Sequence, residues 1–189
     1  MNQSKMYLEK FNRNKLEEKF KQWRNLKFFY PYRELSANPK WQALILTCMD
    51  CRITSNVFGI EDPGEAIIIR NAGALLTKDS LRSILIAIYE LNVNFIAVVG
   101  HTNCGGENTK GRMEELLSKI SKKTKMSRND VLNTLGTDDA SQAFLGFKDV
   151  HLKVPSTVEA LQQHPLIVSV DIDVVGYIYN TQTGDIIKV

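Results

Sequence analysis

Residues 43–52 read ALILTCMDCR, and residues 95–106 read FIAVVGHTNCGG. Each stretch is an apolar run that ends abruptly in side chains able to bind a metal: Cys48 closes the first, and His101 and Cys104 close the second. A short apolar run without polar alternation is typical of a strand in a parallel sheet covered on both faces. The two stretches therefore predict two buried strands, residues 42–48 and 95–99, with metal-type ligands at their ends.

The chain between these strands predicts a third strand and a helix. Residues 66–70 (AIIIR) form another buried apolar run. One helix face follows, with Asp79 as its candidate cap and with Leu81, Ile84, Leu85, Ile88 and Leu91 at helical spacing. The order strand, strand, helix, strand favours an α/β fold with a parallel sheet. In such sheets ligands gather at the carboxyl ends of strands, so Cys48 and His101 converge if their strands are neighbours.

The second half of the chain predicts several helices and then a hairpin. Residues 112–163 are mostly helical in pattern, with Ser127 as one cap and Ser156 with Glu159 as a capping box. The last helix ends near residue 164, because Pro165 follows. Residues 166–170 and 173–180 resemble strands, and a turn containing Gly184 leads into a final short antiparallel strand at 186–189.

The three candidate ligands favour zinc. Two thiolates (Cys48 and Cys104) and one imidazole (His101) form a donor set that suits this ion. Three protein ligands with a fourth position left for water are the pattern of a catalytic zinc site. Asp50 and Arg52 lie directly beside Cys48, and an acidic group next to a metal-bound water is what hydration chemistry requires.

Cys48-x-Asp50-x-Arg52 followed by His101-x-x-Cys104 resembles the β-class carbonic anhydrases, in particular the short archaeal and bacterial branch. The resemblance extends to EAIIIRNAGALLT (65–77), HPLI (164–167) and DVVGYIYNTQTGDIIKV (173–189), and covers roughly residues 40–189. It implies a central, mostly parallel sheet in the order 2-1-3-4 with an antiparallel edge strand, flanked by helices. The chain departs from the family pattern at Cys51, where a Ser is usual.

The resemblance also implies roles for the site residues and the reversible hydration of carbon dioxide to bicarbonate. Asp50 accepts a hydrogen bond from the zinc-bound water, and Arg52 keeps Asp50 ionised and oriented. In some family members this Asp instead takes the fourth zinc position. The backbone of Gly105 and Gly106 is a candidate site for the product anion, and the candidate carbon dioxide pocket consists of Ile53, Val57 and Phe58.

Three alternatives stay open. Relatives of this short branch hydrolyse carbonyl sulfide or carbon disulfide, which are linear and attacked at carbon as carbon dioxide is. Cys48 and Cys51 also form Cys-x-x-Cys, which is compatible with a redox pair. The same two cysteines with His101 and Cys104 would make a closed Cys3His zinc site in a binding module without catalysis.

The composition sets the remaining expectations. The chain has 189 residues, and we expect one domain over 1–189 with residues 1–35 as an N-terminal helical arm. Leu16, Phe20 and Trp23 share a helix face that packs either on its own domain or on another subunit of a dimer or tetramer.

A net charge of +3 does not indicate nucleic-acid binding. No segment indicates a membrane span, and three cysteines favour the reducing cytoplasm.

Overall fold

The computed structural model describes residues 13–24, 34–107 and 110–189. The chain divides into two compact units, Met1–Ser36 and Ala37–Val189. The first unit contains helix α1 (Arg13–Arg24), which confirms the helix predicted there. Leu16 and Phe20 are exposed, and the side chain of Trp23 lies outside the described side chains. Among the described helices, none is both long and apolar enough to cross a membrane.

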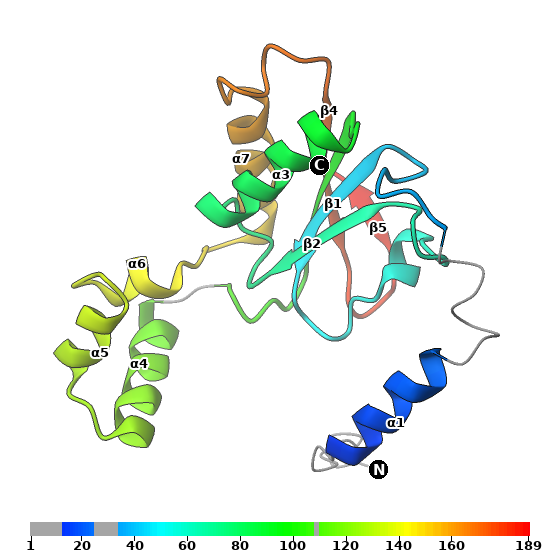
Figure 1. The fold of residues 1–189 in the computed structure, drawn as a ribbon. Helices are drawn as coiled ribbons and strands as arrows, with labels where there is room; N and C mark the ends of the chain where they lie inside the picture. Colours follow the sequence, from blue (N-terminus) through cyan, green and yellow to red (C-terminus); the bar gives the residue numbers. More distant parts are fainter. Residues whose placement is uncertain (1–12, 25–33, 108–109) are drawn as a thin grey trace. The chain divides into compact units, whose positions relative to one another are not determined.

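The second unit is built on one five-stranded sheet (Figure 1). The strands are β1 (Ala43–Cys48), β2 (Ile67–Asn71), β3 (Phe95–His101), β4 (Asp173–Tyr179) and β5 (Ile186–Lys188). Their order is β2-β1-β3-β4-β5, and every neighbouring pair is parallel except β4 with β5. The α/β class, the 2-1-3-4 order and the antiparallel edge strand are therefore confirmed.

Strands β1 and β3 are direct neighbours. Thr47 pairs with Val99 in the ladder, and the Thr47 hydroxyl donates a hydrogen bond of 3.0 Å to the Val99 carbonyl. Every residue of β1 is buried, as are all residues of β3 after Phe95. The two strands therefore end at the same edge of the sheet, where Cys48 is the last residue of β1 and His101 is the last residue of β3.

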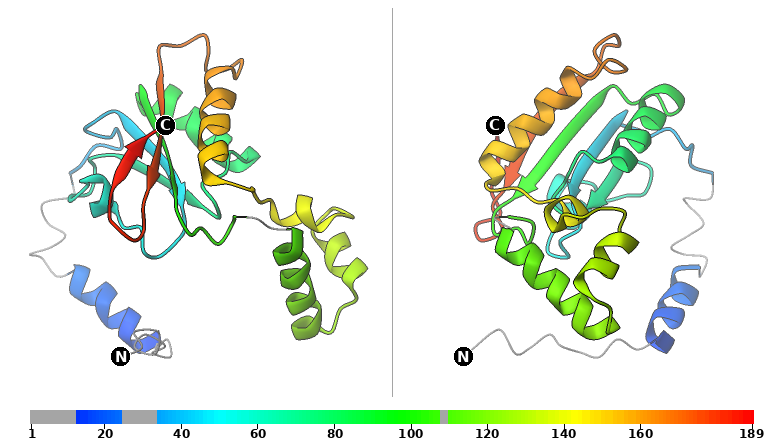
Figure 2. Two further views of the ribbon diagram at one scale, coloured as in Figure 1. Left: turned by 180° about the vertical axis from the view of Figure 1, so that it is seen from behind. Right: turned by 90° about the vertical axis from the view of Figure 1, so that its left-hand side faces the viewer.

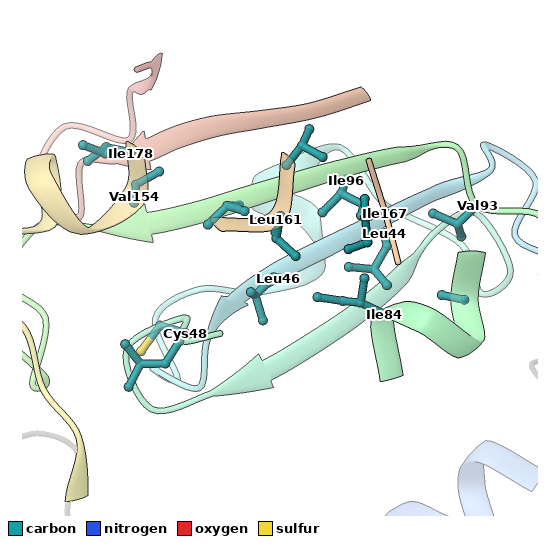
Figure 3. Packing of buried hydrophobic residues seen from close by; sticks show 14 of the residues in the cluster. Leu44, Leu46, Cys48, Ile84, Val93, Ile96, Val154, Leu161, Ile167 and Ile178 are labelled. Atoms are coloured by element: carbon teal, nitrogen blue, oxygen red, sulfur yellow. The ribbon is translucent and has the colours of Figure 1, made fainter. Parts of the chain in front are cut away.

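Two helices cover one face of the sheet. Helices α3 (Lys78–Glu90) and α7 (Val150–Gln162) both lie on this side, as the right-hand view in Figure 2 shows. The main core fills the space between them and the strands (Figure 3), and it includes Leu44, Leu46, Ile84, Ile96 and Leu161. The alternate strand residues Ile45, Ala97 and Val99 face the other side, where they form a smaller cluster with Ile60.

Helix α7 packs closely on the sheet at two glycines. A Cβ atom placed on Gly100 would lie 2.6 Å from methyl carbons of both Val150 and Val154. A Cβ atom on Gly176 of β4 would lie 2.8 Å from Val154. Because only glycine permits this approach, the helix contacts the strand immediately before His101.

Three more helices form a small cluster of their own. They are α4 (Lys110–Thr124), α5 (Arg128–Thr134) and α6 (Ala140–Phe144), and their buried residues are Met113, Leu117, Val131, Leu132 and Ala140. Ser127 caps α5 as predicted, because its hydroxyl accepts the Asp130 N–H. A short 3-10 helix, η3 (Ser55–Phe58), lies in the connection after β1.

Two predicted helix starts are wrong. Thr77, and not Asp79, caps α3, because the Thr77 and Ser80 side chains exchange hydrogen bonds with each other's backbone N–H. Helix α7 begins at Val150 with Asp149 as its cap, so Ser156 lies inside the helix. The buried stripe of Val150, Val154, Thr157 and Leu161 carries the helix through Pro155, and this packing outweighs the local capping signal.

Residues 166–170 do not form the predicted strand. They make turns in which the N–H groups of Ile167 and Val168 both donate to the His164 carbonyl. Ile167 alone is buried, at 2% exposure, so one anchor side chain satisfies the apolar pattern. The predicted strand at 66–70 exists as β2, but it is half-buried because it pairs on one side only.

We expect Gly100→Ala to destabilise the fold by about 1–3 kcal/mol, because the added methyl group overpacks the contact with α7. Gly111→Ala is the matched control, since a Cβ atom at this exposed position in α4 meets no atom within 4 Å and Ala favours a helix. Urea unfolding of both variants measures the difference. Equal midpoints would contradict close packing at Gly100.

Candidate metal centre

The structure brings the three predicted ligands together. The ligand atoms of Cys48, His101 and Cys104 all lie within 4.8 Å of one another, and all three residues are buried. The first two end neighbouring strands, and Cys104 follows three residues later in the loop after β3. The parallel pairing of β1 with β3 therefore assembles the group.

The geometry of the group fits a tetrahedral metal ion. The Sγ atoms of Cys48 and Cys104 are 3.8 Å apart. Two thiolates at about 2.3 Å from one tetrahedral zinc ion would be ~3.8 Å apart, the same separation. His101 Nε2 is buried and has no hydrogen-bond partner among the described residues. A buried nitrogen without a partner is costly, and a metal ion would satisfy it.

The His101 ring is oriented from its far side. Nδ1 lies 2.9 Å from the Thr102 carbonyl, which can only accept, so Nδ1 carries the proton and Nε2 has the free lone pair. The Thr181 hydroxyl donates to the same carbonyl at 3.2 Å, and the Thr181 N–H donates to the Thr102 hydroxyl at 3.1 Å. The turn before β5 thus fixes the carbonyl that fixes the imidazole.

Backbone N–H groups and the neighbouring thiol stabilise the sulfurs. The Gly73 N–H donates to Cys48 Sγ at 3.4 Å, and the Gly106 N–H donates to Cys104 Sγ at 3.4 Å. The pKa of Cys48 falls to about 4, mainly because of its hydrogen bond with the Cys104 thiol and despite the cost of burial. The same contact raises the pKa of Cys104. Without a metal, the two sulfurs therefore share one proton between them.

Asp50 lies beside the group in a fixed orientation. Arg52 donates to both carboxylate oxygens, from Nε to Oδ1 at 2.9 Å and from Nη2 to Oδ2 at 2.6 Å. These hydrogen bonds hold the pKa of Asp50 well below its usual range, against the effect of burial. Asp50 Oδ2 is 3.9 Å from His101 Nε2, so an ionised carboxylate borders the space that the three ligands face.

Burial lowers the pKa of His101, but the nearby Cys48 sulfur and the hydrogen bond to the Thr102 carbonyl outweigh it and raise the pKa overall. Electrostatic attraction from Cys48 and Asp50 adds to this. The centre therefore attracts positive charge to the imidazole nitrogen that lacks a partner, as expected of a cation-binding site.

Arg70 also supports the site, and our sequence reasoning missed this contribution. Its Nε donates to the Cys48 carbonyl at 3.2 Å and its Nη2 to the Asp50 carbonyl at 2.7 Å. The side chain reaches across from β2 and fixes both the end of β1 and the loop that follows it. A cation at the end of an otherwise apolar strand was the available signal.

The other predicted site residues lie around the centre in different settings. Ile53 is buried in the core cluster that includes Cys48 and Cys104, whereas Val57 and Phe58 are half-buried. Gly105 is exposed with open space at its Cβ position. A Cβ atom on Gly106 would lie 3.2 Å from Phe147 and 3.7 Å from the sulfur of Cys104.

Cys51 does not join the ligand group. Its side chain is exposed, while the three ligands are buried, and the group that could hold a metal among the described residues consists of Cys48, His101 and Cys104. Among the described residues, the structure therefore does not form the closed Cys3His site, and the group has three ligands.

Three residues that could hold a metal ion, with an adjacent carboxylate, lie at the carboxyl ends of two neighbouring parallel strands, an arrangement typical of α/β metalloenzymes. The sequence model of the family described as carbonic anhydrase matches residues 43–186. The chain belongs to this family, in its β class, which confirms the resemblance of the motifs.

Relatives and solved structures agree over most of the chain. A carbon disulfide hydrolase from Acidianus sp. (strain A1-3) is 32% identical over 82% of this chain and 80% of its own length. The crystal structure of carbonic anhydrase from Streptococcus mutans matches with a TM-score of 0.74 and 28% identity over 95% of this chain and 99% of that one. The crystal structure of β-carbonic anhydrase isoform I from Trichomonas vaginalis matches with a TM-score of 0.78 and 26% identity, over 94% of this chain and 97% of that one.

We expect Thr181→Val to weaken metal binding about threefold to tenfold, because the variant keeps the shape of the side chain but no longer supports the Thr102 carbonyl. Chelator competition for Co²⁺ measures the affinity without any assay of activity. Thr183→Val is the matched control, since its hydroxyl bonds Asp185 in the same turn. An unchanged affinity in Thr181→Val would show that the hydroxyl does not help to position His101.

Proposed function

We propose that this protein binds zinc at Cys48, His101 and Cys104 and catalyses the reversible hydration of carbon dioxide to bicarbonate and a proton. The observation that carries the proposal is the ionised Asp50 carboxylate, which Arg52 holds 3.9 Å from His101 Nε2, a nitrogen with no hydrogen-bond partner among the described residues. Family membership supports the same reaction.

A zinc ion held by Cys48, His101 and Cys104 would lower the pKa of a water molecule towards about 7 and so would supply hydroxide near neutral pH. Asp50 accepts a hydrogen bond from the attacking water and directs its lone pair at the substrate carbon. Arg52 keeps Asp50 ionised. Both Asp50 oxygens accept hydrogen bonds from Arg52, which supports an orienting role for Asp50 rather than the role of a fourth ligand.

Apolar side chains near the centre are the proposed binding surface for carbon dioxide. Ile53 packs in one cluster with the two ligand cysteines, and we assign it, with Val57 and Phe58, to the substrate pocket. The backbone of Gly105 and Gly106 lies beside Cys104, and we assign it to the product. The open space at Gly105 is compatible with an anion there.

The alternative substrates are carbonyl sulfide and carbon disulfide. The relative named carbon disulfide hydrolase, 32% identical to this chain, favours this alternative. Attack at the carbon of a linear molecule is common to all three substrates, so the same Asp50 and zinc ligands would serve each of them.

The proposal includes a homo-oligomer of two or four copies. Within residues 37–189, helices α3 and α7 cover one face of the sheet. On the other face, Phe58, Ile68, Phe95 and Tyr177 are only partly buried around the smaller cluster. A second copy would bury this surface, and the arm at residues 1–35 would add to the contact. The three free thiols favour the reducing cytoplasm.

We expect the protein to sediment as a dimer or tetramer, and Ile68→Glu to dissociate it, because a buried unpaired carboxylate is costly. Ile86→Glu is the matched control: Ile86 lies on α3, covering the opposite face, and is already 41% exposed. Sedimentation velocity distinguishes the variants. A monomeric wild-type protein would refute the proposed assembly.

The reaction itself is tested by stopped-flow carbon dioxide hydration with a pH indicator, on protein of known zinc content. We expect zinc-dependent hydration, and for Asp50→Asn a loss of about 100-fold or more in kcat/KM with zinc retained. If the zinc-loaded wild-type protein does not hydrate carbon dioxide but hydrolyses carbon disulfide or carbonyl sulfide, the substrate is one of these two molecules and not carbon dioxide.

Cys51→Ser is the matched control for this assay, because it changes the residue next to Asp50 without touching the ligand group. We expect it to retain both zinc and activity. Loss of zinc in Cys51→Ser would contradict the three-ligand centre.

A further inference from the structure

A cleft of about 600 Å³ adjoins the metal centre and is lined by Asn103, Cys104, Glu107, Arg112 and Lys148. Cys104, one of the three ligands, forms part of its wall. The remaining lining residues are polar, and two of them are cations. The cleft therefore differs from the apolar surroundings of Ile53, and an uncharged linear substrate gains little from these side chains.

Arg112 is held in place by the loop that follows the ligands. Its Nη1 donates to the Gly105 carbonyl at 2.9 Å. Within the described part of the chain, its Nε and Nη2 make no hydrogen bond; the guanidinium attracts the Glu115 carboxylate electrostatically, but Glu115 forms its ion pair with Lys119. Nε and Nη2 form one edge of the guanidinium fork, which matches the two oxygens of a planar oxyanion.

The lining of the cleft carries a net positive charge, because it includes two cations, Arg112 and Lys148, and one acidic residue, Glu107. The structure gives Lys148 no ion pair with any described residue. Glu107 Oε1 accepts the Val150 N–H at 3.4 Å, and the Glu107 carboxylate forms no ion pair with either cation. Two cations face one carboxylate that is directed to the backbone, so the cleft attracts anions.

We propose that Arg112 and Lys148 form an anion subsite that receives bicarbonate at the mouth of the metal centre. Bicarbonate is planar and carries two oxygens at the spacing of a carboxylate, and it is the charged partner in the proposed reaction. The inference rests on the proposed function and deepens it. An oxyanion subsite is suited to exchange between carbon dioxide and bicarbonate, and has no comparable use for uncharged carbon disulfide or carbonyl sulfide.

The test is binding of ¹³C-bicarbonate to the full-length protein loaded with Co²⁺, followed by the paramagnetic relaxation of the carbon at constant ionic strength. The zinc-loaded protein is the diamagnetic reference. We expect Arg112→Gln/Lys148→Gln to raise the apparent dissociation constant about tenfold, since each exposed charge contributes about threefold. Lys148→Gln alone, which breaks no hydrogen bond with a described residue, should raise the apparent dissociation constant about threefold.

The matched control is Lys122→Gln/Lys123→Gln, which removes the same two charges from the exposed last turn of the same helix that carries Arg112. We expect this pair to bind bicarbonate as the wild type does. An equal loss in both pairs would assign the effect to net charge and overturn the subsite. Unchanged binding in Arg112→Gln/Lys148→Gln and in Lys148→Gln would overturn it as well.

The outcome is independent of the hydration assay. If the zinc-loaded protein does not hydrate carbon dioxide but loses bicarbonate binding only in the Arg112 and Lys148 variants, the subsite stands and the proposed reaction fails. If hydration is present and bicarbonate binding is insensitive to these two residues, the reaction stands and the subsite fails.

Discussion

The parallel ladder between β1 and β3 is the constraint on which the metal centre depends. Side chains alternate along a strand, so a shift of one residue in this register would turn Cys48 to the opposite face of the sheet. The register is fixed because both strands are buried and because the Thr47 hydroxyl ties β1 to the Val99 carbonyl. The hydrophobic core therefore sets the positions of two polar ligands.

Backbone groups contact each of the three ligands. The N–H groups of Gly73 and Gly106 donate hydrogen bonds to the two sulfurs, and the Thr102 carbonyl accepts a hydrogen bond from His101 Nδ1. These dipoles are fixed by turns and need no reorganisation when charge appears on the sulfurs. Side-chain charge is kept further out, in Asp50 with its Arg52 partner, where it adjoins the open position.

The sequence predicted the buried strands and the ligand types of Cys48, His101 and Cys104, because these are local patterns. The strand order, and with it the convergence of the ligands, was implied by the family resemblance. The sequence prediction failed where packing outweighs a local signal. Helix α7 begins at Val150 and continues past Pro155, because its buried residues pack on the sheet. The predicted strand at 166–170 is a turn in which Ile167 is the buried side chain. Arg70 and Thr181 reach the site across the sheet and from the distant turn before β5, so spacing along the chain could not identify them.

The contact between α7 and Gly100 has a consequence for how this chain tolerates change. The residue before a metal ligand has no side chain to give way, and the valines of a distant helix rest directly on its backbone. A substitution at Val150 or Val154 therefore changes the packing on the backbone of Gly100, one peptide bond from His101. Substitutions in α7 and the position of His101 are therefore coupled, although the helix contributes none of the three ligands.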